Sequence, residues 1–348
     1  MLLHIFNPEH DLALAANIAN FTAPHAGRQL RTDLGYIPAL WAGTGDCVLV
    51  EDVPFAEKTF RRLMHRPFDR FVEKQEIGRL PLRGIAPWGW DLALRAYLER
   101  HGVGATLLPS DLQMTDIRDL SHRRHAMALL RHLQQKGTTG ESLFLETPEM
   151  VTRQLELWPR MVIKAPWSSS GRGVRFVDNT IGVQQRGWIS HVIKQQGGVM
   201  VEPYYSKVKD FGMEFESDGE GRVTYSGLSL FHTSNGAYTG NVLADESSKM
   251  EMITHYISAD LIEKVKSVIC HCLGLLYNHR YQGPLGVDMM IVARDDKRGF
   301  LLHPCVEINL RRTMGHVALS IPPSPSGSPR VMNVIYNENS YKLKICKL

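Results

Sequence analysis

The sequence predicts an α/β protein with more than one domain, and three observations support this fold class. The chain has 348 residues, which exceeds the length of one typical domain. In its first part, short apolar runs at 2–6, 37–41 and 47–50 alternate with helical patterns, and this alternation is typical of a parallel sheet. The stretch 137–150 is rich in Gly, Thr and Glu, so we expect it to connect domains; strand-like runs joined by short turns follow from 162.

The composition indicates a globular protein that binds neither nucleic acid nor membranes. Hydrophobic residues make up 43% of the chain and charged residues 22%, and the formal net charge of +4 is too small to imply a polyanionic partner. Five cysteines, odd in number and irregularly spaced, argue against a disulfide framework. With no long apolar run near the start, we expect no signal peptide or membrane span, and we expect the cytoplasm as the location.

The first apolar run ends at a polar loop, NPEHD, at residues 7–11. Ligands of parallel sheets gather at the carboxyl ends of strands, so the loop residues are candidate substrate contacts. The alternative is a loop that only caps the following helix through its Asn or Asp side chain. The candidates are Asn7, Glu9, His10 and Asp11.

A strand that ends on Lys164 leads into the small-residue loop SSSGRG and then into a second strand. The backbone amides and hydroxyl groups of such a loop can surround phosphate oxygens, and Lys164 adds a positive charge. The loop is not a Walker A motif, because no GK[ST] follows and it leads into a strand. A plain hairpin turn is the alternative. The loop residues are Ser168, Ser169, Ser170, Gly171, Arg172 and Gly173.

The run GGVMVEPYYSKVKDFGMEFE, at 197–216, predicts two strands with an interruption at Glu202 and Pro203. Proline has no N–H and cannot continue a central ladder, so we expect the chain to turn away there. Such a turn leaves backbone donors and acceptors for a planar group, and adenine would fit. The second strand starts near Asp210.

The run VEINLRR, at 306–312, carries Glu307, Asn309 and Arg311 at alternate positions. In a strand, the period of two places all three side chains on one face. Asp288 interrupts an apolar strand upstream, and a charge there is costly unless it is paired or bound to metal. These oxygens suit magnesium, and the guanidinium suits a transferred anionic group. The alternative is an edge strand with a solvated polar face.

Four motifs follow one another in the chain: the lysine before the Ser/Gly loop, V-E-P-Y, the aspartate of a G-x-D strand, and E-x-N-x-R. In order and in approximate spacing they resemble those of the ATP-grasp superfamily, and EINLRRTMGH looks closest to its biotin-carboxylase-like branch. The match covers about residues 120–320. The resemblance implies a Rossmann-like N-terminal domain and then an ATP-grasp module of two subdomains with antiparallel sheets, an α+β grasp. The implied bounds are 1–115 for the first domain, 116–320 for the module with subdomains at about 145–205 and 206–320, and 321–348 for a C-terminal linker and tail.

The resemblance also implies roles in binding ATP. Lys164 would contact the α and β phosphates, and the loop 168–173 would fold over them. Glu202, Pro203 and Tyr204 would form the hinge that holds adenine, mainly through backbone groups. Asp210 would take the ribose hydroxyls.

The implied metal is Mg²⁺, held by Asp288, Glu307 and Asn309, and Arg311 would stabilise the transferring group. The sequence departs from the pattern at one position. Many members carry a lysine in the helix before the module, whereas this chain reads SHRRH at 121–125. Arg123 or Arg124 can take that role, although an arginine fork has a different geometry.

The implied activity is an ADP-forming ligation of a carboxylate to an amine through an acyl phosphate. A small-molecule kinase and a nucleotide-binding regulatory protein without turnover are the alternatives, and a complete metal set argues against the latter. The expected partners are small-molecule carboxylate and amine substrates, and a homodimer is allowed. The sequence does not name the substrates.

Overall fold

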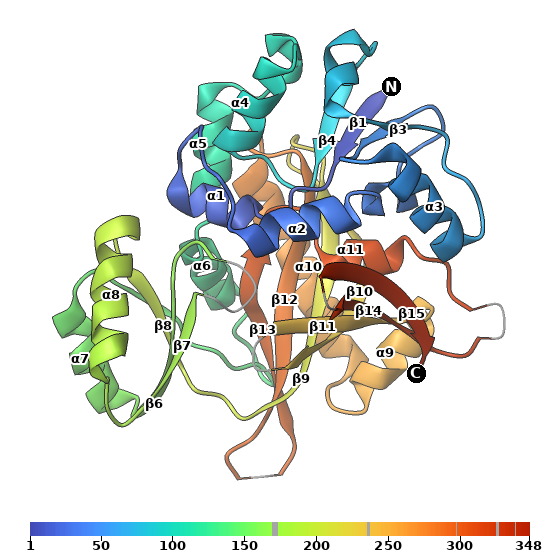
Figure 1. The fold of residues 1–348 in the computed structure, drawn as a ribbon. Coiled ribbons are helices and arrows are strands. Elements are labelled where there is room, and N and C mark those ends of the chain that lie inside the picture. The colour runs from blue at the N-terminus through green and yellow to red at the C-terminus, as the bar shows by residue number, and fades with distance from the viewer. Residues whose placement is uncertain (169–172, 235–236, 297, 325–326, 338) are drawn as a thin grey trace. The chain divides into compact units, whose positions relative to one another are not determined.

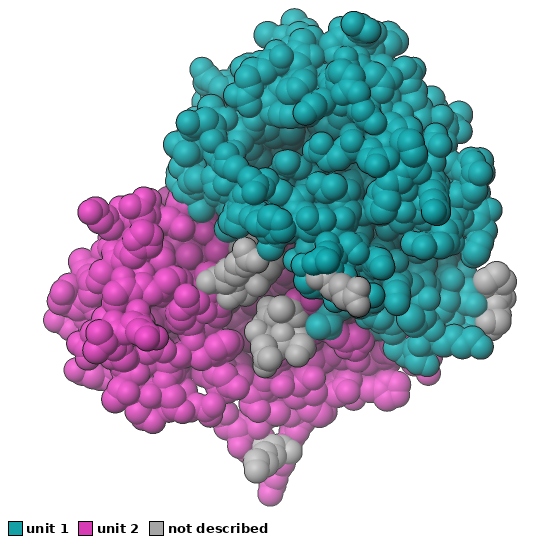
Figure 2. Space-filling view, viewed as in Figure 1, with its two compact units in different colours: residues 1–118, 239–245, 311–348 teal, residues 119–238, 246–310 magenta. Residues whose placement is uncertain are grey.

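The structure is a computed structural model, and it describes residues 1–348 except 169–172, 235–236, 297, 325–326 and 338 (Figure 1). The chain forms two compact units, coloured separately in Figure 2. No helix in the described part of the chain is both long and apolar enough to cross a lipid bilayer. Unit 1 comprises Met1–Arg118, Thr239–Asp245 and Arg311–Leu348, and unit 2 comprises Asp119–Tyr238 and Glu246–Leu310.

Unit 1 contains a parallel four-stranded sheet in the order β3-β2-β1-β4. The chain runs outward from β1 to β2 and β3 and then returns to the other side of β1, which creates a topological switch point beside β1. The parallel sheet expected from the sequence is therefore confirmed. The strands are β1 (Leu2–Ile5), β2 (Cys47–Leu49), β3 (Phe71–Val72) and β4 (Gly84–Pro87).

Helices accompany this sheet, and aspartate side chains cap the starts of the helices at 53–64 and 92–100. Asp52 accepts a hydrogen bond from the Phe55 amide and Asp91 from the Leu94 amide, both at 2.9 Å. The helices with residues in unit 1 are α1 (His10–Ala16), α2 (His25–Leu34), α3 (Val53–Met64), α4 (Leu92–Arg100), α5 (Asp111–Leu120) and α11 (Met314–Leu319), with 3-10 helices η1 (Ile37–Leu40), η2 (Lys74–Arg79) and η3 (Ala105–Leu107).

The expectation of a strand at 37–41 was wrong. This stretch forms η1, in which Pro38 fixes one φ angle and supplies no N–H for a strand ladder. The sheet beside it is buried on both faces, because alternate residues of β2 enter different cores. Cys47 packs with Leu3 and Leu98, whereas Val48 packs with Phe60.

The C-terminal segment, expected as a linker and tail, contributes to the core of unit 1. It forms an antiparallel hairpin of β14 (Arg330–Asn337) and β15 (Ser340–Lys347), and β14 pairs with β11 (Ala237–Leu243). Met332 and Leu343 are buried in one cluster with Leu34. The predicted three-part domain division stays a prediction, but the stretches 330–337 and 340–347 form strands.

Unit 2 begins with an antiparallel sheet in the order β5-β8-β6-β7, which α7 and α8 accompany (Figure 1). Its core includes Val151 of α7, Ile163 of β6 and Ile189 of α8. The elements are β5 (Leu143–Leu145), α7 (Pro148–Leu157), β6 (Arg160–Lys164), β7 (Val174–Asp178), α8 (Val183–Gln196) and β8 (Val199–Pro203).

A second antiparallel arrangement in unit 2 has the order β13-β12-β9-β10. Two antiparallel sheets after a parallel one confirm the predicted fold class. The elements are β9 (Lys207–Ser217), β10 (Val223–Ser234), β12 (Gly283–Ala293) and β13 (Phe300–Asn309), with helices α6 (Arg124–His132), α9 (Glu246–Thr254) and α10 (Ala259–Tyr277).

Candidate functional site

Lys164 and Glu202 form a buried ion pair between neighbouring strands of unit 2. The Lys164 Nζ lies 2.6 Å from the Glu202 Oε2, and the two residues are 8% and 6% exposed. Val162 of β6 pairs with Glu202 of β8, so Lys164, two residues further along, lies diagonally across on the same face. The predicted phosphate-binding lysine is thus held in place by the first residue of the predicted hinge.

Arg123, which precedes α6, joins the root of the Ser/Gly loop to β13. Its guanidinium donates to the Ala165 carbonyl, to the Ser168 Oγ at 2.9 Å, to the Ser168 carbonyl at 3.1 Å and to the Glu307 Oε1 at 2.6 Å. Arg123 is 8% exposed, whereas the side chain of Arg124 is half exposed and pairs with Asp119. Of the two arginines that could replace the missing lysine, Arg123 contacts other predicted site residues.

The predicted phosphate loop is described only in part. Ser168 is buried, and a Cβ on Gly173 would lie 2.1 Å from the Ser168 Oγ, so glycine is needed for the two ends of the loop to approach. Four further residues predicted for this loop lie outside the described residues: Ser169, Ser170, Gly171 and Arg172.

Asp288 and Glu307 lie directly opposite each other on β12 and β13. Asn309 Nδ2 donates to Asp288 Oδ2 at 3.0 Å, so the three predicted metal ligands are adjacent. Mg²⁺ takes oxygen ligands and is typically bound by one or two carboxylates while phosphates and waters complete its shell. Two carboxylates and an amide fit that requirement, although the described residues contain no group of three or more His, Cys, Asp or Glu side chains that could hold a metal.

Charges from both groups of predicted residues act on the thiol of Cys305, within β13. Cys305 is 2% exposed, and burial raises the pKa of its thiol above the ordinary value. The charged side chains that also act on the pKa of this thiol are Glu202, Asp288, Lys164 and Glu307.

The hinge differs from the expectation in one respect, because the strand does not break before Pro203. Pro203 is the last residue of β8 and pairs with Met161 of β6. The Tyr204 amide donates to the Arg160 carbonyl on the β6 side, so the Pro203 nitrogen faces the β5 side. There β5 pairs only as far as Val201, so the proline removes no ladder bond.

Asp210 is bonded to two neighbours in unit 2. Lys207 Nζ and Thr233 Oγ1 both donate to Asp210 Oδ2 at 2.6 Å. The side chain is 16% exposed and could still accept from a ligand through its second oxygen. Its predicted contact with ribose stays a prediction.

Arg311 does not belong to the same strand as Glu307 and Asn309. Strand β13 ends at Asn309, and Arg311 belongs to unit 1, where Nη2 donates to Asp11 Oδ2 at 2.8 Å and Nε to both carboxylate oxygens at 3.1 Å. The expectation of three alternating side chains on one strand was therefore wrong for Arg311. A bidentate pair fixes its guanidinium in unit 1.

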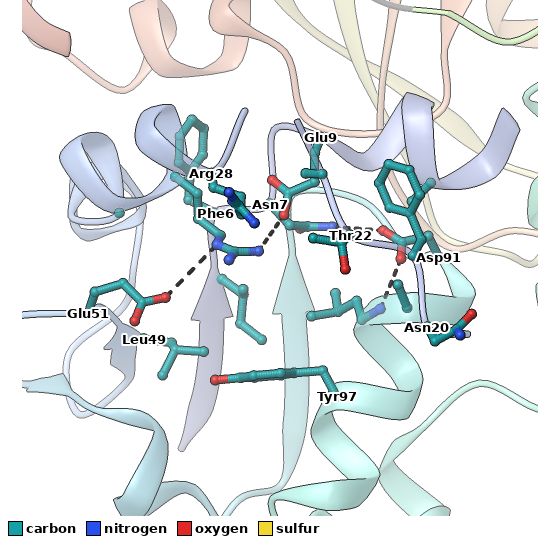
Figure 3. Close-up of a pocket in the computed structure, with 18 of the residues that line it drawn as sticks. Phe6, Asn7, Glu9, Asn20, Thr22, Arg28, Leu49, Glu51, Asp91 and Tyr97 are labelled. Atoms are coloured by element: carbon teal, nitrogen blue, oxygen red, sulfur yellow. Dashed lines mark hydrogen bonds and ion pairs between the residues drawn. The ribbon is translucent and has the colours of Figure 1, made fainter. Parts of the chain in front are cut away.

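The NPEHD loop places its four candidates in different environments. Asn7 donates to the Gly89 carbonyl at 2.8 Å and to Asp91 at 3.1 Å, and His10 is fully buried. Asn7 and Glu9 line a cavity of about 320 Å³ in unit 1, shown in Figure 3. Asp11 holds Arg311 instead.

His303 is a residue that the sequence reasoning missed. It is fully buried beside Tyr205 at a ring distance of 5.4 Å, and neither ring nitrogen has a hydrogen-bond partner among the described residues. Burial, with the nearby Lys164 charge, lowers the pKa of His303 to about 3, so the ring is neutral. The only signal for it was one histidine in an apolar strand, FLLHPCV.

No family model matches the sequence, and neither does any curated protein. The structure is similar to the biotin carboxylase domain of the 2-oxoglutarate carboxylase of Hydrogenobacter thermophilus, with a TM-score of 0.55 and 12% identity over 96% of this chain and 74% of that one. It is also similar to the biotin carboxylase of Campylobacter jejuni, with a TM-score of 0.52 and 14% identity over 96% and 75%.

These structural similarities, with the sheets described above, establish the fold of the chain. The chain has the ATP-grasp fold. Within that fold, the solved structures that it resembles include biotin carboxylases.

Proposed function

We propose that the protein is an ATP-dependent, magnesium-requiring ligase that joins a carboxylate to an amine and forms ADP. The observation that carries this proposal is the pair of opposed carboxylates, Asp288 and Glu307, with Asn309 beside them. The fold supports it too. The Hydrogenobacter domain was solved with magnesium ADP and bicarbonate, and the Campylobacter enzyme in a β,γ-ATP complex.

The residues of unit 2 would share the work of holding ATP. Lys164 would neutralise phosphate charge, and Glu202, whose carboxylate it already contacts, would fix the position of its amine. Arg123 would add a second cation at the loop, because its fork reaches Ser168 and Glu307. The backbone of Glu202 to Tyr204 would receive adenine.

Asp288, Glu307 and Asn309 would hold Mg²⁺, which would supply positive charge to neutralise the charge that develops on the phosphates. A substrate carboxylate would then attack the γ-phosphorus, and the bond to the β-phosphate oxygen would break to release ADP. An amine would displace phosphate from the acyl phosphate. Arg311, held by Asp11, would neutralise the transferring group.

The test is ADP release from ATP and Mg²⁺ across a panel of carboxylates and amines, with hydroxylamine added to trap an acyl phosphate as a hydroxamate. We expect hydroxamate with the correct carboxylate. A stable phosphorylated hydroxyl without hydroxamate would indicate a kinase instead. Absence of binding at millimolar ATP by calorimetry would contradict every nucleotide-dependent activity.

A further inference from the structure

The cavity in unit 1 lies where the topology of its sheet favours a ligand. Asn7 follows β1, Glu51 follows β2, and Asp91 begins α4 after β4, so the cavity opens at the carboxyl ends of parallel strands. The sheet order β3-β2-β1-β4 places the switch point beside β1, at the same end. Every residue that lines the cavity belongs to unit 1.

Two adjacent charged groups in the cavity have atoms left to bond. Glu9 is 8% exposed; its Oε1 accepts from the Arg31 Nη1, but its Oε2 is buried and has no hydrogen-bond partner among the described residues. The Arg31 Nε is likewise buried without a hydrogen bond, 4.0 Å from the Glu51 Oε1. Leaving buried polar atoms unbonded costs free energy, so a ligand that supplied both bonds would be favoured.

The electrostatics of Glu9 also favour a cationic ligand group. Burial raises the pKa of Glu9, and the neighbouring Arg31 opposes this rise. An ammonium at the Oε2 would favour the charged carboxylate, and a carboxylate at the Arg31 Nε would satisfy the remaining donor. An α-amino acid carries both groups on one carbon, which matches two adjacent protein groups of opposite charge.

Apolar groups also line the cavity opposite Glu9. Figure 3 shows Tyr97 and Leu49 across the cavity from Glu9, with the ring face of Tyr97 turned toward the space between them. The cavity has a volume of about 320 Å³. This space suits a free amino acid with a large apolar or aromatic side chain.

We propose that unit 1 binds a free α-amino acid with an aromatic or branched apolar side chain, its ammonium on Glu9, its carboxylate on Arg31 and its side chain against Tyr97. We expect the amino acid to bind this site whether or not ATP is bound. Its role as a substrate of the ligation rests on the proposed function.

The experiment is calorimetric titration of the full-length protein with L-phenylalanine and L-leucine in the absence of ATP. We expect L-phenylalanine to bind. Analogues that lack the amine (3-phenylpropionate) or the carboxylate (phenethylamine) should bind at least about tenfold more weakly, because each loses a charge-assisted bond. Equal binding of the analogues, or no binding of either amino acid at millimolar concentration, would overturn the site.

Two variants probe the contacts, with one control. Glu9→Gln should weaken L-phenylalanine binding by about ten- to a hundredfold, and Ala93→Leu, which enlarges a side chain on the cavity wall within α4, should abolish it. The matched control is Glu57→Gln, an exposed residue of α3 that does not line the cavity. Ala93→Leu keeps the test decisive if Glu9→Gln fails to fold. Unchanged binding in a folded Ala93→Leu protein would place the amino acid elsewhere.

Titration with ATP and Mg²⁺ on the same samples separates this inference from the proposed function. If the protein binds ATP but does not bind the amino acid, the amino-acid site is overturned and the ligase proposal stands. If the protein binds the amino acid but does not bind ATP, the ligase proposal is overturned and the amino-acid site stands. If both bind, L-phenylalanine should increase ADP release in wild type and not in Ala93→Leu; unchanged release would overturn its role as a substrate.

Discussion

Asp288 on β12 faces Glu307 on β13 across the antiparallel ladder, so two carboxylates occupy directly opposed positions of one sheet. Like charges in opposed positions are destabilising, and here Arg123 donates to Glu307 while Asn309 donates to Asp288. A cation between them would relieve the remaining repulsion. The proposed magnesium site would therefore account for two acids at opposed positions of neighbouring strands.

Replacing Glu307 tests this arrangement. Glu307→Gln keeps size and removes one charge from the proposed metal site, so the activation barrier should rise by about 2.7 to 4 kcal/mol, roughly a hundred- to a thousandfold in rate. The measurement is ADP release across a magnesium titration. Glu156→Gln, an exposed change on α7, is the control and should keep wild-type turnover. Near-wild-type turnover of a folded Glu307→Gln protein would remove Glu307 from the metal site.

Arg123 and Arg124 are adjacent arginines with different surroundings, so they form a matched pair. Arg123→Lys keeps the charge but cannot reach Ser168 and Glu307 together, so we expect ATP affinity to fall by about ten- to a hundredfold. Arg124→Lys changes a half-exposed residue and should bind ATP as wild type does. Calorimetric titration with ATP and Mg²⁺ measures both. Equal affinities would show that the Arg123 fork plays no part in nucleotide binding.

The Lys164–Glu202 ion pair should contribute measurably to the free energy of unfolding. Lys164→Met leaves the Glu202 carboxylate buried without its partner, which typically costs about 3 to 5 kcal/mol of unfolding free energy. Adding Glu202→Gln removes the stranded charge, so the double variant should regain part of that loss. Urea unfolding of the wild type, single and double variants measures the coupling. A single variant within about 0.5 kcal/mol of wild type would show that Glu202 is not buried as described.

His303 predicts a pH dependence of stability. Because its folded pKa of about 3 lies below the ordinary 6.5, the unfolded chain binds a proton between these pH values that the folded chain excludes. The resulting stability is fully present above about pH 6.5 and is lost as the pH falls toward 3, by up to about 1.4 kcal/mol per pH unit.

The measurement for His303 compares urea unfolding of wild type and His303→Gln from pH 7 to pH 5. The stability difference in favour of wild type should shrink as the pH falls, since the glutamine does not titrate. A pH-independent difference for His303→Gln would mean that the ring titrates normally.

Sequence reasoning correctly predicted the features that follow from local periodicity and from the order of motifs. The alternation of VEIN correctly predicted a strand, and the ordered motifs led to the correct fold class. Sequence reasoning failed where a side chain bonds to a residue that is distant along the chain. Arg311 pairs with Asp11, 300 residues away, and Arg123 reaches Glu307, 184 residues away. No spacing rule in one sequence encodes such contacts.

Short elements were missed for a different reason. Strand β4 reads GIAP, and its glycine and proline hide the strand signal because both are depleted in strands. Its place in the sheet comes from pairing with β1 rather than from intrinsic preference. The cavity in unit 1 was likewise invisible, since Glu9, Arg31 and Tyr97 come from three separate helices or helix starts.

Because unit 1 draws its core from both ends of the chain, the order of synthesis constrains how the protein folds. Residues such as Leu34 and Phe60 leave the ribosome long before Met332 and Leu343, with which they pack. Their contacts with the C-terminal strands cannot form while all of unit 2, at 119–238 and 246–310, is being translated. We therefore expect a nascent chain stalled before β14 to carry a folded unit 2 and an N-terminal segment that chaperones can still bind.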